Sequence, residues 1–225
     1  MALTAALVAE RIAEVRYRIA SAGGDWRAIT IVAVTKDFGS DAVEGAVANG
    51  LRDCGENRAD ELVRKASAVA DGGVRWHYLG RVQRNKVGRL ASFVALWQAV
   101  DRLAAGEEIA RRAPGAAVLV QLNVSGEPQK HGCRPAEGAD LVSGLRSLGL
   151  EVRGLMAVGP TGAPEAARPG FRSLRQLADE LSLPVRSMGM TDDLEIAVEE
   201  GSTMLRLGRA LFGRRPRPER SDLRR

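Results

Sequence analysis

The strongest constraint on the fold is a regular alternation of short apolar segments with segments of helical periodicity. Eight segments are rich in β-branched and small apolar residues, as buried strands are. Their expected ranges are 29–36, 51–54, 74–79, 92–98, 116–124, 150–158, 184–187 and 202–207. Alternation at this spacing indicates βαβ units and a parallel sheet. Because there are eight units, the sequence predicts an α/β protein, a single (β/α)8 TIM barrel rather than a doubly wound sheet.

An additional amphipathic helix is expected in front of the first strand, because apolar residues recur at helical spacing between Leu3 and Ile19. The barrel domain is expected to occupy residues 1–213. Residues 214–225 carry six arginines and two acids, and this basic tail is expected to be disordered because it is almost free of apolar side chains.

Charge and composition exclude several classes of protein. The chain of 225 residues has a net charge of +5, most of which lies in the tail, so the barrel is nearly neutral and no nucleic-acid partner is expected. The N-terminal segment has no basic start and is interrupted by Glu10 and Arg11, so neither a signal peptide nor a membrane span is expected. We therefore expect a cytoplasmic location. Cys54 and Cys133 lack the spacing of a metal site.

Lys36 lies at the end of the first apolar segment, ITIVAVTK. Burying an ammonium group without a partner is costly, so a charge in this place needs an explanation. One interpretation is that Lys36 reaches solvent where the strand becomes a loop. The alternative is a lysine that forms a Schiff base in a dry pocket.

Candidate binding residues follow the last two strands. In TIM barrels the functional site lies past the carboxyl ends of the strands, and a phosphate site after strands seven and eight recurs. Here the segment from Ser187 through Gly189 and Met190 to Thr191 precedes a helix, and Gly208 follows the last strand. Such small residues and free N–H groups suit a phosphate. Taken alone, Thr191 is better explained as an ordinary helix N-cap, and Gly189 is also consistent with a turn.

Arg206 alternates with Leu205 and Leu207 along the last strand. If the leucines face the outer helices, Arg206 points into the barrel, where it needs a polar partner. An amine, a phosphate cradle and an inward arginine are the three groups that pyridoxal 5'-phosphate (PLP) requires. Together they favour the Schiff-base interpretation of Lys36.

Two further residues allow alternatives. His77 has three interpretations. It is a general acid or base, part of the pocket wall, or a hydrogen-bonded histidine inside the barrel. Asn57 either contacts a cofactor or caps the next helix.

Ordered motifs cover most of the chain. They are AVTK ending at residue 36, GEN at 55–57, WHYLGRVQRNK at 76–86, Glu127, Lys130 and Gly132, GLM at 154–156, SMGM at 187–190 and GSTMLRLGRALFG at 201–213. Through these motifs the chain resembles the pyridoxal phosphate homeostasis protein family. That family is related to the alanine racemase N-terminal domain and to the fold-type III decarboxylases.

The resemblance implies that PLP is bound as an internal aldimine on Lys36, with its ring nitrogen near Arg206 and its phosphate near the residues after strands seven and eight. The candidate cofactor-binding residues are Lys36, Asn57, His77, Met156, Ser187, Gly189, Met190, Arg206 and Gly208. Two positions depart from the family pattern, because Arg81 replaces a common histidine and Arg209 a common threonine. The resemblance also implies a monomer that acts in intracellular PLP homeostasis, by buffering or delivery, with PLP-dependent apoenzymes as possible recipients.

Catalytic turnover is not expected. An arginine only donates hydrogen bonds, so at the ring nitrogen it favours an unprotonated pyridine, which is a poorer electron sink. Racemisation also needs a second base, and Tyr17 and Tyr78 are the only tyrosines. The alternative hypothesis is a single-domain PLP-dependent amino-acid racemase or lyase.

Overall fold

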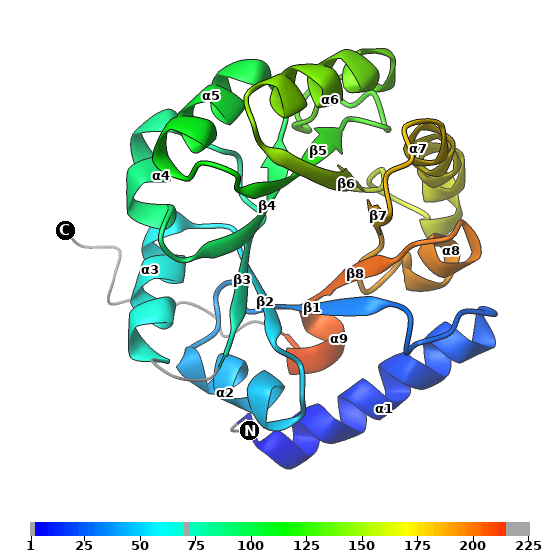
Figure 1. Ribbon diagram of the computed structural model, residues 1–225. Helices are drawn as coiled ribbons and strands as arrows, with labels where there is room; N and C mark the ends of the chain where they lie inside the picture. Colours follow the sequence, from blue (N-terminus) through cyan, green and yellow to red (C-terminus); the bar gives the residue numbers. More distant parts are fainter. Residues whose placement is uncertain (1–2, 70–72, 215–225) are drawn as a thin grey trace.

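The centre of the molecule is a closed barrel of eight parallel strands in the order β1 to β8, in which β8 pairs with β1. The structure is a computed structural model, and it describes residues 3–69 and 73–214. Figure 1 looks along the barrel and shows the helices arranged around its outside. The predicted (β/α)8 TIM barrel and the additional N-terminal helix are both confirmed. The predicted disorder of the tail concerns residues that, apart from Arg214, lie outside those described.

The strands match the predicted segments to within two residues at each end. They are β1 Thr30–Val34, β2 Asp53–Glu56, β3 Arg75–Tyr78, β4 Val94–Val100, β5 Ala117–Leu122, β6 Glu151–Ala157, β7 Val185–Ser187 and β8 Met204–Leu207. The α-helices are α1 Ala5–Ser21, α2 Ser40–Ala48, α3 Ala59–Ala68, α4 Arg84–Leu90, α5 Leu103–Arg112, α6 Gly138–Ser147, α7 Arg168–Glu180, α8 Leu194–Glu199 and α9 Arg209–Phe212. Two short 3-10 helices, η1 Pro135–Glu137 and η2 Pro164–Ala167, precede α6 and α7. Within the described ranges, no helix is both long and apolar enough to cross a membrane.

Two apolar layers hold the barrel together. The larger layer lies between the strands and the helices and includes Leu205 and Leu207. The smaller layer fills part of the barrel interior with Val32, Leu96, Ala99, Ala117, Leu119, Met156 and Met204. Because side chains alternate along a strand, the outward leucines of β8 turn Arg206 inward, as predicted, and it is buried.

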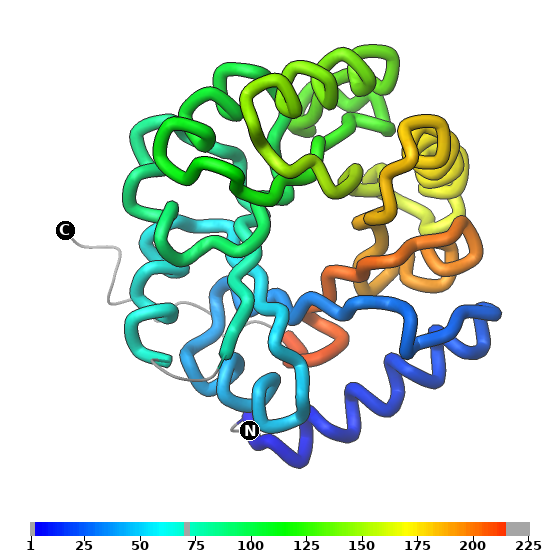
Figure 2. Tube along the Cα trace, in the orientation of Figure 1, coloured from blue at the N-terminus to red at the C-terminus, as the bar shows by residue number. Residues whose placement is uncertain are grey.

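Helix α1 closes the outside of the barrel where β8 meets β1. Its buried face, Val8, Ile12, Val15 and Ile19, packs near α2, α8 and α9. Figure 2 shows the long blue tube of α1 running beside the orange-red tube of α9. A bidentate ion pair fixes the C-terminal half of α1, because Arg18 Nε and Nη2 lie 2.6 and 2.8 Å from the carboxylate of Glu195.

Three local predictions at the helix starts are wrong. Gly55 and Glu56 belong to β2 rather than to a loop, and Asn57 is not an N-cap, because α3 begins after Arg58 without a side-chain cap. Thr191 does not cap α8, whose N-cap position is Asp193; instead its Oγ1 accepts a hydrogen bond from the Ala210 N–H at 3.1 Å. The Thr191 hydroxyl thus serves the start of α9 rather than that of α8.

A buried ion pair explains why a strand can end in a glutamate. The Lys65 ammonium on α3 donates to Glu56 Oε1 at 2.5 Å and to the carbonyl oxygen of Thr35 at 2.7 Å. The Thr35 hydroxyl donates to the same Glu56 oxygen at 2.6 Å. Burial raises the pKa of Glu56, and the hydrogen bonds from Lys65 and Thr35 oppose that rise. Both charged side chains have no exposed surface, so each depends on the other.

Removing the ammonium should therefore be costly. We expect Lys65→Met to lower the free energy of unfolding by about 3–5 kcal/mol, since it leaves a carboxylate buried without its partner. Denaturant unfolding measures this change. Adding Glu56→Gln to the variant should recover part of the loss, because it removes the orphaned charge. Lys86→Met on the outer helix α4 is the matched control, and a loss below about 1 kcal/mol in Lys65→Met would contradict the prediction.

Candidate functional site

A pocket of about 530 Å³ opens at the carboxyl ends of the strands. Its wall comes from the segments that follow several strands. The lining residues are Val34, Lys36, Phe38, Asn57, Leu79, Gln121, Met156, Val158, Met190, Thr191, Asp192, Arg206, Gly208, Arg209, Gly213 and Arg214. Apolar side chains, two loop segments and several cations therefore share one concave surface.

Lys36 lies two residues beyond the end of β1 and is half-buried. It lines this pocket and also an adjoining one of about 430 Å³, which includes Arg58, Arg81 and His131. The main chain just before Lys36 is fixed, because the Thr35 carbonyl accepts from the buried Lys65. The end of β1 thus places the amine of Lys36 at the boundary between the two pockets.

Arg206 enters the pocket from the barrel interior. Its Nη1 donates to the Ser187 carbonyl at 2.6 Å and to the Ser187 hydroxyl at 2.8 Å, and its Nη2 donates to the Ala157 carbonyl at 2.7 Å. Burial lowers the pKa of Arg206 to about 10, so the guanidinium remains charged at neutral pH. These hydrogen-bond acceptors are all neutral oxygens, so no carboxylate cancels the charge through a direct hydrogen bond.

The loops after β7 and β8 approach each other closely. Gly189 has a φ of +97°, and a Cβ there would overlap Ala197 and lie 2.7 Å from Leu205 Cδ2. At Gly208 a Cβ would lie 3.1 Å from the Val34 carbonyl oxygen. Glycine is therefore required at Gly189 by both conformation and space. It lets the loop after β7 pack closely against Ala197 and Leu205 behind the pocket wall.

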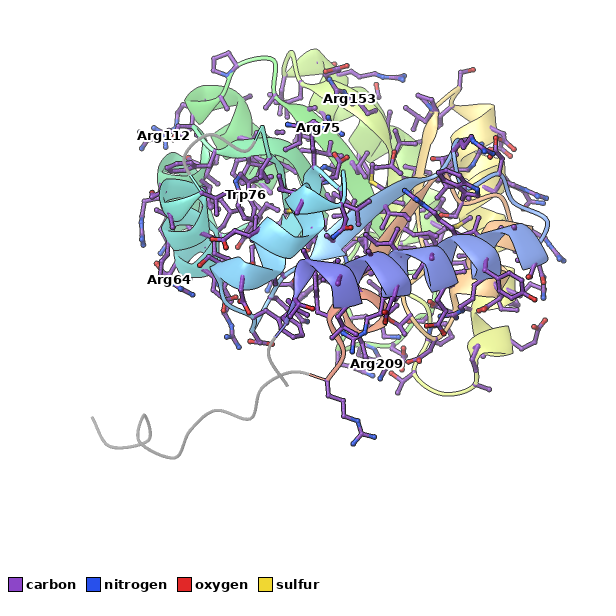
Figure 3. All side chains as sticks on the ribbon, turned by 90° about the horizontal axis from the view of Figure 1, so that it is seen from below. Arg64, Arg75, Trp76, Arg112, Arg153 and Arg209 are labelled. Atoms are coloured by element: carbon purple, nitrogen blue, oxygen red, sulfur yellow. The ribbon has the colours of Figure 1, made fainter. Side chains whose placement is uncertain are left out.

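Two polar groups of these loops already have partners. The Met190 N–H donates to Asp193 Oδ1 at 2.6 Å. Arg209 pairs with Asp192, which also lines the pocket. Position 209 thus carries an exposed guanidinium in an ion pair, and this residue is labelled in Figure 3.

The predicted site residues divide into two groups. Six of them lie together on the pocket wall: Lys36, Asn57, Met156, Met190, Arg206 and Gly208. The other three, Ser187, Gly189 and His77, are buried and are not among the lining residues. Ser187 and Gly189 stand directly behind the wall, because Ser187 bonds to Arg206 and the Gly189 carbonyl accepts from the Arg206 N–H at 3.0 Å.

His77 has the geometry of a hydrogen-bonded histidine inside the barrel, one of the alternatives that the sequence left open. Its Nε2 lies 3.0 Å from Asp53 Oδ1, and its Nδ1 lies 2.6 Å from Gln98 Nε2. Asp53 also accepts from Arg75 Nε at 2.9 Å. Burial by itself would raise the pKa of Asp53, but the hydrogen bonds from His77 and Arg75 outweigh it and lower that pKa to about 2.

The sequence prediction missed several residues of the site. Gln121 lines the pocket near the end of β5 and donates to the His131 carbonyl at 2.9 Å. Gln98 lies inside the barrel and donates to His77. A glutamine in an otherwise apolar strand is the signal that would have found both, because a buried amide needs partners.

Fold and pocket together define a single-barrel protein with a lysine and an uncompensated arginine at the carboxyl ends of its strands. The family model described as "Alanine racemase, N-terminal domain" matches residues 11–216. A relative from Pseudomonas aeruginosa named pyridoxal phosphate homeostasis protein is 40% identical over 92% of this chain and 96% of its own length. One of that name from Escherichia coli strain K12 is 34% identical over 92% and 97%.

Solved structures agree with these relatives. PipY from Synechococcus elongatus, described as having PLP bound, is 30% identical with a TM-score of 0.80, over 92% of this chain and all of that one. An alanine racemase from Clostridium difficile, 15% identical with a TM-score of 0.74 over 91% of this chain and 59% of its own, shares the fold alone. The chain belongs to the alanine racemase N-terminal domain family and, within it, to the pyridoxal phosphate homeostasis proteins.

The lowered pKa of Asp53 predicts a pH dependence of stability. Its ordinary value is 3.8 and its folded value about 2, so its stabilising contribution is complete above about pH 4 and is lost as the pH falls toward 2. A shift of this size corresponds to about 2 kcal/mol. The stability gap between the wild type and Asp53→Asn, from denaturant unfolding, should shrink by that amount between about pH 5 and pH 2. A gap that stays constant over this range would refute the assignment.

Proposed function

We propose that this protein binds PLP through Lys36 as an aldimine, and that it buffers or delivers the cofactor without catalytic turnover. The relatives named pyridoxal phosphate homeostasis protein and the PLP-bound PipY support this proposal. The observation that carries it is the position of Lys36 and Arg206 on the wall of one pocket.

The donor groups of the pocket fit the cofactor. Lys36 supplies the amine, and Arg206 supplies a cation that can only donate, which suits the lone pair of an unprotonated pyridine nitrogen. Thr191, Gly208 and Arg209 would hold the phosphate, since they combine main-chain approach with positive charge, and Met190 would lie beside it on the wall. When bound, PLP supplies an aldehyde carbon for reversible imine formation.

The remaining candidate residues take defined places in this proposal. Asn57 and Met156 would contact the cofactor from the wall. Ser187, Gly189 and His77 would act from behind it, by fixing the residues that reach the pocket.

The chemistry of the wall favours holding the cofactor over turning over a substrate. Arg206 leaves the pyridine unprotonated, so the ring withdraws electrons less strongly. Tyr78 is buried against Trp97, with ring centroids 5.7 Å apart, and Tyr17 on α1 is 73% exposed. Asp192, an acid on the wall, is paired with Arg209. None of these three residues is placed as a racemase's second base, which speaks against the racemase or lyase alternative.

The proposal extends to partners and assembly. The protein would act as a monomer in the cytoplasm and hand PLP to PLP-dependent apoenzymes. The near-neutral charge of the barrel supports interaction with a small molecule rather than with nucleic acid.

The covalent assignment predicts a selective effect at one lysine. Borohydride reduction of PLP-loaded protein, followed by peptide mass mapping, should place the pyridoxyl group on Lys36. Lys36→Ala should abolish the absorbance of the bound imine, because the amine that forms it is gone. Lys86→Ala on α4, outside both pockets, is the control and should retain the absorbance. Labelling of another lysine at wild-type yield in Lys36→Ala would overturn the assignment.

The absence of turnover predicts a second result. In deuterated buffer, amino acids added to the PLP-loaded protein should exchange their α-proton no faster than with free PLP at the same concentration, as followed by proton NMR. The physical reason is the poor electron sink together with the lack of a placed second base. Exchange about 100-fold faster than with free PLP would instead support the racemase or lyase alternative, because a positioned base contributes at least that much.

A further inference from the structure

A line of five polar side chains crosses the barrel interior from Arg206 to its opposite end. Arg206 Nη1 lies 2.8 Å from Ser187 Oγ, which lies 2.7 Å from Gln98 Oε1. Gln98 Nε2 lies 2.6 Å from His77 Nδ1, and His77 Nε2 lies 3.0 Å from Asp53 Oδ1. All five residues are at most 8% exposed.

The two ends of this line have fixed hydrogen-bonding roles. The ionised carboxylate of Asp53 only accepts, and the guanidinium of Arg206 only donates. Asp53 is the first residue of β2, whereas Arg206 lines the pocket at the carboxyl ends of the strands. Figure 3 shows the two ends of the barrel, because Arg75, the partner of Asp53, and Arg209 are labelled on opposite sides of the molecule.

With a neutral His77, these fixed ends determine the direction of every link between them. Since Asp53 accepts, His77 carries its hydrogen on Nε2, and a neutral imidazole then accepts at Nδ1. The amide nitrogen of Gln98 must donate to that atom, so its Oε1 faces Ser187. The Ser187 hydroxyl donates to Gln98 and keeps its lone pairs for the Arg206 guanidinium.

With a neutral His77, no other arrangement satisfies all four links. A doubly protonated His77 would require the flipped Gln98 amide, which leaves the Ser187 hydroxyl hydrogen without an acceptor in the line. The other imidazole tautomer would set a lone pair of His77 against the Asp53 carboxylate. A flipped Gln98 amide would set its oxygen against the lone pair of His77 Nδ1, and it would leave the Ser187 hydroxyl hydrogen without an acceptor in the line. Gln98 Nε2 also lies 3.2 Å from Met204 Sδ, a weak acceptor, which agrees with the assigned orientation.

We infer that Gln98 is a positioning residue for the cofactor site: it orients the Ser187 hydroxyl, and through it Arg206, in a direction set by His77 and Asp53 at the far end of the barrel. This inference rests on the proposed function, in which Arg206 faces the ring nitrogen of PLP. Gln98 itself does not line the pocket, so it acts through Ser187 and not by touching the ligand.

The test is a double-mutant cycle between Gln98 and Ser187, with the PLP dissociation constant and the absorbance spectrum of bound PLP as readouts. Gln98→Met keeps the size of the side chain but removes the link. We expect it to raise the dissociation constant about tenfold and to shift the spectrum, because the chromophore includes the ring nitrogen that Arg206 faces. In a Ser187→Ala background the same change should have almost no further effect.

Leu96→Val is the matched control, because Leu96 lies in the apolar interior on the same strand as Gln98 but outside the line. It should destabilise the barrel without a spectral change. Arg75→Gln, which keeps Asp53 and His77 in place, should leave PLP binding within about twofold of the wild type.

The possible outcomes separate the proposed function from the inference about Gln98. If the wild type binds no PLP, the proposed function fails. Two results with a wild type that binds PLP would show that the inference about Gln98 is wrong while the proposed function stands. In the first, Gln98→Met changes neither the dissociation constant nor the spectrum. In the second, it weakens binding as much in the Ser187→Ala background as in the wild type. If Gln98→Met does not fold, Gln98→Leu in the wild-type and Ser187→Ala backgrounds provides the same comparison, because leucine likewise offers no acceptor to the Ser187 hydroxyl.

Discussion

The burial of one guanidinium is the constraint on which the site depends. Arg206 keeps its charge and only donates, so inside a barrel it needs a set of acceptors without competing donors. Parallel strands supply such acceptors where they end, and the carbonyls of Ala157 and Ser187, the last residues of β6 and β7, accept from Arg206. The charge is therefore tolerated at the carboxyl end of the barrel, the end at which a TIM barrel builds its ligand sites.

Lys36 reaches the same pocket because β1 is the neighbour of β8. Val32 pairs with Arg206, and Lys36 follows four residues after Val32, just beyond the end of β1. The buried pair of Lys65 and Glu56 fixes the main chain immediately before Lys36 through Thr35. A lysine amine and a buried guanidinium in one pocket favour a ligand that carries both negative charge and a group that reacts with an amine, which describes a phosphorylated aldehyde.

The sequence alone predicted those features of the fold that a short repeating pattern of side chains encodes. Alternation along β8 predicted the inward Arg206, and the eight apolar segments predicted the barrel. Prediction from such patterns failed where the local structure depends on a partner elsewhere in the sequence. Gly55 and Glu56 have the composition of a loop and become strand because Lys65 neutralises the glutamate. Likewise Gln98 and Ser187 are 89 positions apart, and nothing near either residue shows that their side chains meet.

The same polar line also limits what the site can do. A general base needs a lone pair directed at the substrate, and an acid needs a proton that it can release. Along the line from Asp53 to Arg206, the hydroxyl of Ser187, the amide of Gln98 and both ring nitrogens of His77 are used by neighbours inside the barrel. Only the guanidinium reaches the pocket, and it cannot accept a proton. This polar line therefore presents a fixed charge to the ligand, while its other side chains are held by one another, which agrees with the proposed retention of a cofactor.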